Sequence, residues 1–277
     1  APAEKALPRP FVYAFYTCIV TGFWLVIYFV GLIPGLSDLG IPHFSNVETP
    51  TIQVVGMSFL AAYTFFMALV SLYDALRHAD ASDVMPVIGA VSAISTFGMS
   101  FLFLGTRISP TFIWGILLLA VGTMLVSQVR FTKHIIVLTI HSGIFFALHY
   151  IAMKGLFQET NFDDGFFWSR VMFVLFALSL LLVPAYFEKI RIQTGATSRQ
   201  TGFLVFGNKI MSGVAAFMLL KATDWGDVAV VQALDGLKFV FILIISIFLG
   251  RFIPVSAGEN EHDAKTLIRK FAYVAII

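Results

Sequence analysis

Apolar runs of about 20 residues recur along the whole chain, and they constrain its fold more than any other feature. A helix of about 20 apolar residues crosses the hydrocarbon core of a bilayer. The polar stretches between the runs are short, so no soluble domain is expected. The predicted spans are 11–33, 51–76, 84–104, 111–128, 134–157, 165–187, 201–220, 227–249, and an incomplete one from about 268.

Composition agrees with a chain that lies almost wholly in the bilayer. Hydrophobic residues make up 58% of the sequence and charged residues 12%, whereas soluble domains have about 25% charged residues. The net charge of +2 gives no indication of nucleic-acid binding. We therefore expect an all-α polytopic membrane protein, an integral multi-pass protein of the cytoplasmic (inner) membrane.

The two halves of the sequence share a pattern. The stretch "LRHADASDV" (76–84) aligns with "LKATDWGDV" (220–228), including two aspartates and one basic residue. The apolar runs that follow both end in Leu-Gly, as "FLFLG" (101–105) and "SIFLG" (246–250). Such self-similarity predicts an internal repeat.

Extending this alignment predicts the architecture. The predicted pairs of spans are 11–33 with 165–187, 51–76 with 201–220, 84–104 with 227–249, and 111–128 with the run from about 268. The span 134–157 lacks a partner, which would precede residue 1. We therefore expect ten helices in the native chain, with the first missing and the last truncated here. They form two five-helix repeats, 1–130 and 131–277. An odd number of spans inverts the second copy, and inverted repeats are typical of alternating-access transporters.

The same region carries a resemblance to a known family. The segment "LRHADASDVMPVIGAVSAISTFGMSFLFLGTRIS", followed by "FIWGILLLAVGTMLVS", resembles the EamA-like branch of the drug/metabolite transporter superfamily. The Gly-Glu usual in the first turn is Gly105-Thr106 here, and the second-half turn has Gly250-Arg251. The resemblance implies ten helices and transport of a small molecule, without naming the substrate.

Charged residues inside the apolar runs indicate a candidate site. In "VVQALDGLKFVF" (230–241), Asp235 precedes Lys238 by three residues, so both lie on one helix face. Lys238 is expected roughly 16 Å into its span, near the middle of a core about 30 Å thick. Lys209 is expected at a similar depth in the preceding span. Such charges cost about 2.5–3.5 kcal/mol each to insert, and are functional by default.

Two interpretations of these charges remain open. They are either an ion-pair network that joins two helices, or a polar site that meets a substrate carboxylate or phosphate. Residues expected to bind substrate are Lys209, Asp235, Lys238, Gln232, Asn208, His149 and Tyr150. For His141 and His149, a hydrogen bond between helices competes with a proton-relay role. Trp168 and Arg170 are expected at the membrane interface, at the start of the span 165–187.

We predict a secondary transporter that moves a small metabolite by alternating access. The alternatives are a membrane-embedded enzyme, or a receptor-like helical bundle with a lysine Schiff base, in which the other buried charges are structural. The sequence has no catalytic motif, no metal-binding motif and no nucleotide-binding loop. We therefore expect no enzymatic activity, no metal and no cofactor. Transport would draw on exchange or on a gradient of protons or other ions.

Overall fold

The computed structural model describes residues 10–35, 40–79, 81–106, 113–118, 121–122, 132–196 and 199–235. Within these residues the chain is helical and has no strand. Lys238, the second half of the span 227–249, the run from about 268 and much of the span 111–128 lie outside the described residues.

The first predicted span is one continuous helical rod. It comprises α2 (Pro10–Thr21), the 3-10 helix η1 (Gly22–Val26) and α3 (Ile27–Gly31). The tightened turn begins at Gly22, where a Cβ atom would lie only 2.5 Å from Val174 Cγ2. Glycine thus lets this rod approach the neighbouring helix closely.

Three long helices follow the predicted spans within a few residues. These are α4 (Ile52–His78), α5 (Ala81–Leu104) and α7 (Lys133–Glu159). The hydroxyls of Thr51 and Thr132 accept hydrogen bonds from the first turns of α4 and α7, as N-cap residues do. Both helices therefore begin where a capping side chain precedes an apolar run.

The span 165–187 is the prediction that differs most. Asn161 caps α8 (Phe162–Leu180), which begins earlier than predicted. The chain then turns by 98° into α9 (Pro184–Ala196). Proline is favoured in the first turn of a helix, where its missing N–H is not needed, so Pro184 starts a new helix after the break. Much of the stretch between the predicted spans 165–187 and 201–220 is therefore helical.

The last described helices are α10 (Arg199–Trp225) and α11 (Val228–Asp235). Asp227 caps α11, because its carboxylate accepts from the backbone N–H of Ala229 at 2.8 Å. A carboxylate at this position stabilises the first turn of the helix, as N-cap residues do.

Four helical segments of the described residues are long and apolar enough to cross a membrane, or five if the bent pair α8–α9 counts as one span. They agree with a multi-pass membrane protein. The four are Pro10–Gly31, Ile52–His78, Val84–Leu104 and Lys133–Glu159.

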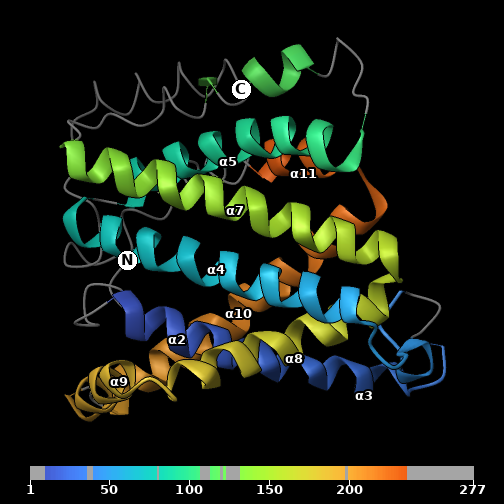
Figure 1. The fold of residues 1–277 in the computed structure, drawn as a ribbon, viewed down its shortest axis with the longest axis horizontal. Coiled ribbons are helices and arrows are strands. Elements are labelled where there is room, and N and C mark those ends of the chain that lie inside the picture. Colours follow the sequence, from blue (N-terminus) through green and yellow to red (C-terminus); the bar gives the residue numbers. More distant parts are fainter. Residues whose placement is uncertain are drawn as a thin grey trace, which may run out of the picture.

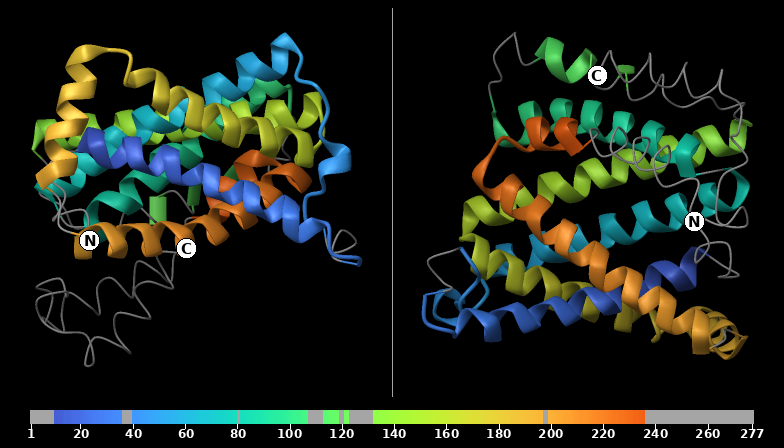
Figure 2. Two further views of the ribbon diagram at one scale, coloured as in Figure 1. Left: turned by 90° about the horizontal axis from the view of Figure 1, so that it is seen from below. Right: turned by 180° about the vertical axis from the view of Figure 1, so that it is seen from behind.

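The helices pack as a layered bundle. α7 lies between α4 and α5, and α8 and α2 pack on α4 and on each other (Figure 1). α11 packs on α5. Figure 2 shows α10 crossing the back of the bundle diagonally, where it contacts α2 and α7. One buried apolar core joins α2, α4 and α8, and a second joins α3, α4, α7 and α8.

Candidate substrate-binding cavity

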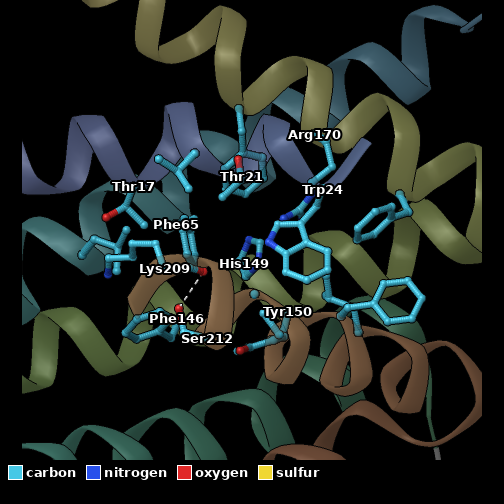
Figure 3. A pocket seen from close by; sticks show the side chains of 18 of the residues that line it. Thr17, Thr21, Trp24, Phe65, Phe146, His149, Tyr150, Arg170, Lys209 and Ser212 are labelled. Atoms are coloured by element: carbon cyan, nitrogen blue, oxygen red, sulfur yellow. Dashed lines mark hydrogen bonds between the residues drawn. The ribbon is translucent and has the colours of Figure 1, made fainter. Parts of the chain in front are cut away.

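A cavity of about 230 Å³ lies where α2, η1, α4, α7, α8 and α10 meet (Figure 3). Its walls are mainly aromatic and aliphatic, with a few polar groups. The described lining residues are Thr17, Val20, Thr21, Trp24, Phe65, Leu69, Tyr73, Phe146, His149, Tyr150, Phe166, Arg170, Phe173, Lys209, Ser212, Gly213, Ala216, Phe217 and Leu220. Apolar walls with few polar groups are typical of sites for small organic ligands.

Arg170 lies inside the bundle, near the middle of α8. The expected position at the membrane interface, at the start of the span 165–187, is therefore wrong. Only 6% of its surface is exposed. Its guanidinium carbon lies 4.9 Å from the centroid of the Phe166 ring and 4.6 Å from that of Phe173. Nε is 3.4 Å from Ser169 Oγ, and Nη2 is buried with no hydrogen-bond partner.

The local sequence explains this placement. Phe166, Arg170 and Phe173 are spaced by four and three residues, so one helix face presents all three. The signal that could have placed Arg170 correctly is the N-cap at Asn161, followed by acidic residues in the first turn. Read from this cap, Arg170 falls near the centre of the helix and not at its start.

Lys209 provides the second cation of the cavity. From α10, its Nζ donates to the Tyr73 hydroxyl at 2.7 Å and lies 4.4 Å from the centroid of the Tyr13 ring. These contacts join α10 to α4 and α2. In Figure 3, Lys209 and Arg170 lie on different sides of the cavity, with His149 between them.

His149 lines the cavity and also holds two helices together. It is 3% exposed, and its Nδ1 lies 3.0 Å from the Ala61 carbonyl oxygen of α4. Nδ1 must donate this hydrogen bond, because a carbonyl only accepts. His141, earlier in the same helix, bonds through Nδ1 to the Ser71 hydroxyl at 2.7 Å. The expected hydrogen bonds between helices are therefore confirmed, and a proton-relay role stays a prediction.

Tyr150 also lines the cavity and connects it to α11. Its side chain lies close to that of Gln232, which is 5% exposed and whose Nε2 has no hydrogen-bond partner among the described residues. Asp235 interacts electrostatically with Tyr150 but is not among the described lining residues. Gln232 and Asp235 thus lie behind Tyr150, outside the cavity wall.

The other two expected site residues are not placed at the cavity. Asn208 is exposed, although it precedes Lys209 in the chain. Lys238 lies outside the described residues, so its pairing with Asp235 stays a prediction. The structure therefore brings three of the expected residues together at the cavity: Lys209, His149 and Tyr150.

Glycine at position 213 permits the close approach of α10 to the first rod. A Cβ atom there would collide with the indole of Trp24. Both residues line the cavity. This contact forms part of the wall between α10 and η1.

The similarity of this chain to known proteins concerns its fold and not its function. No protein-family model matches the sequence, and no curated protein matches it. The chain is similar to a solved structure described as "Crystal structure of protein", with a TM-score of 0.63 and 17% sequence identity. The similarity covers 99% of this chain and 89% of the other.

Proposed function

We propose that the protein is a secondary transporter of the cytoplasmic (inner) membrane and that its substrate, a small metabolite, binds in this cavity. The proposal rests on one observation: both predicted repeats contribute helices to the walls of the cavity. α2, η1 and α4 come from the predicted first repeat, whereas α7, α8 and α10 come from the second. Transporters built from inverted repeats place the substrate site at the interface of the two halves.

The pattern of helix contacts supports this proposal. Under the predicted pairing, α2 corresponds to α8, α4 to α10, and α5 to α11. α2 packs on α8, and α5 packs on α11. Two helices that are related by a two-fold axis running between them would pack on each other in this way. The contact of α4 with α8 has a counterpart in the contact of α10 with α2. The cavity borders the α2–α8 pair, and therefore the proposed two-fold axis.

Alternating access between the two halves would open this cavity to each side of the membrane in turn. The sequence contains no nucleotide-binding loop, so uphill movement would use exchange or a gradient of protons or other ions. The drug/metabolite transporter resemblance of the sequence supports the same class of activity.

Reconstitution into liposomes tests the proposal. We expect uptake of at least one member of a labelled panel of organic acids, amino acids and sugars. Ala216→Trp should abolish that uptake, because residue 216 lines the cavity and an indole would fill it.

The matched control is Ala215→Trp, which introduces the same side chain at the adjacent, exposed position of α10 outside the described cavity lining. It should retain uptake. Equal uptake by wild type and Ala216→Trp would refute the cavity as the transport site.

A further inference from the structure

We infer that the cavity binds a small organic anion and that Arg170 holds its carboxylate or phosphate group. This inference rests on the proposed function, because it takes the cavity to be the substrate site. It goes further by assigning a substrate class and the residue that recognises it.

The charges of the cavity wall point to an anion. Two basic residues, Arg170 and Lys209, line it, and no carboxylate is among the described lining residues. A cationic ligand would be repelled by the Arg170 guanidinium, whose Nη2 has no hydrogen-bond partner among the described residues. An anion would be attracted to it, since electrostatic complementarity determines which ligands a site admits.

Arg170 is held in place without being neutralised. The rings of Phe166 and Phe173 contact its guanidinium and fix the orientation of its plane. In the described part of the chain, no carboxylate lies within ion-pair distance of it, and Nη2 donates to nothing. Buried cations are normally paired and hydrogen-bonded. A guanidinium offers parallel N–H donors that match the two oxygens of a carboxylate or phosphate.

Lys154 is a basic residue with a structural role, and its hydrogen bonds contrast with those of Arg170. Its Nζ donates to three backbone carbonyl oxygens, those of Thr223 at 2.9 Å, Asp224 at 2.8 Å and Gly226 at 2.9 Å. All three donors of this ammonium are thereby used, and the end of α10 is fixed to α7. Within the described residues, the guanidinium of Arg170 has one hydrogen bond, a long one to the Ser169 hydroxyl at 3.4 Å. This contrast is expected if the missing acceptors of Arg170 come from a ligand.

The rest of the wall suggests the body of the ligand. Aromatic rings, including those of Phe65, Phe146 and Trp24, form much of the lining. They would contact an apolar or aromatic group attached to the anionic head. Suitable probes are therefore phenylacetate and phenyl phosphate, with phenylacetamide as the neutral analogue of the same shape.

The experiment measures probe binding to the purified full chain in detergent, by thermal stabilisation and by titration. We expect phenylacetate, phenyl phosphate or both to stabilise wild type, and phenylacetamide to do so at least about tenfold less well. The two anions share the phenyl ring and carry a carboxylate or a phosphate on a one-atom linker, so their comparison also indicates which head group is preferred.

Substitutions then assign the effect to Arg170. Arg170→Met should weaken anion binding about thirtyfold or more. Arg170→Lys should weaken anion binding less, because the positive charge remains while the paired, parallel N–H donors of the guanidinium are lost. Arg77→Met, at an exposed arginine near the end of α4, should bind as wild type does.

Three outcomes would overturn the inference. They are equal binding of amide and acids, no stabilisation of monodisperse wild type by either anion, and unchanged affinity in folded Arg170→Met. If Arg170→Met does not fold, the comparison of acid with amide on wild type and on Arg170→Lys decides.

Failure of this inference is distinguishable from failure of the proposed function. Uptake of a neutral or cationic metabolite that Ala216→Trp abolishes, with no anion binding, would refute the anion class and leave the transporter intact. Loss of any dependence of uptake on residue 216 would refute the transporter site itself.

Discussion

Two parts of α8 lie about two helical turns apart and differ in how their polar groups are satisfied. At the N-terminal end, Asp163 Oδ2 accepts from the His43 N–H at 3.1 Å and from Asn46 Nδ2 at 2.7 Å. Asp164 Oδ1 accepts from the N–H of Glu48 at 2.9 Å. These carboxylates hold the loop between α3 and α4 against the start of α8.

At the middle of α8, Arg170 is nearly as buried as Asp164, but its Nη2 has no hydrogen-bond partner among the described residues. A buried unsatisfied polar group costs about 1–3 kcal/mol, and more when it is charged. The comparison teaches that satisfied polar groups build the scaffold of this helix, whereas the unsatisfied one faces a cavity. The predictions below test that division of roles.

The largest expected effect is on activity at the middle of the helix. Arg170→Met should reduce uptake of the anionic substrate about thirtyfold or more, because it removes the proposed partner of the substrate charge. Without ligand, the melting temperature should equal or exceed that of wild type, because removal of an unpaired buried charge does not destabilise a fold. A melting temperature well below wild type would instead indicate a structural role for Arg170.

The next effect is on stability at the N-terminal end. Asp164→Ala should lower the free energy of unfolding by about 2 kcal/mol, because it leaves the Glu48 N–H without its charged acceptor. Denaturant unfolding in detergent measures this change. Stability equal to wild type would show that the loop is not held by this bond.

The smallest effect is at the cap of the same helix. Asn161 Oδ1 accepts from the backbone N–H of Asp164 at 2.9 Å, so Asn161→Ala should lower stability by about 1 kcal/mol. Asn161→Asp, which retains the capping acceptor but loses the Nδ2 donor to the Asn46 carbonyl oxygen, serves as the control and should recover most of this loss. Both variants should leave uptake unchanged, since residue 161 is not among the described lining residues of the cavity. A loss of uptake in Asn161→Ala at intact stability would contradict the separation between scaffold and site.

Much of the helical layout could be predicted because hydropathy determines where a chain can cross a bilayer. The spans 51–76, 84–104 and 134–157 match α4, α5 and α7 closely. The span 165–187 was wrong at its C-terminal end, since apolar residues continue past Leu180 while the backbone turns by 98°. Hydropathy shows that residues are apolar but gives no information on the direction of the helix. Pro184 was the sequence signal that indicated the break between α8 and α9.

The candidate site could be predicted in part for a related reason. Lys209 and His149 stand out as polar residues deep within apolar runs. Arg170 did not, because its depth depends on where α8 begins. The cap at Asn161 sets that start, and a short polar segment before an apolar run is easily read as a loop.

The sequence by itself determined that this protein is helical and of the multi-pass membrane class. Long apolar segments in a bilayer must satisfy their own backbone hydrogen bonds, and an α-helix does so within one segment. Only the tertiary structure decided which buried polar groups find partners. Lys209 meets Tyr73 and His149 meets Ala61, across separations of 136 and 88 residues. Such contacts depend on how helices pack, and the same packing leaves Arg170 facing the cavity with an unused donor.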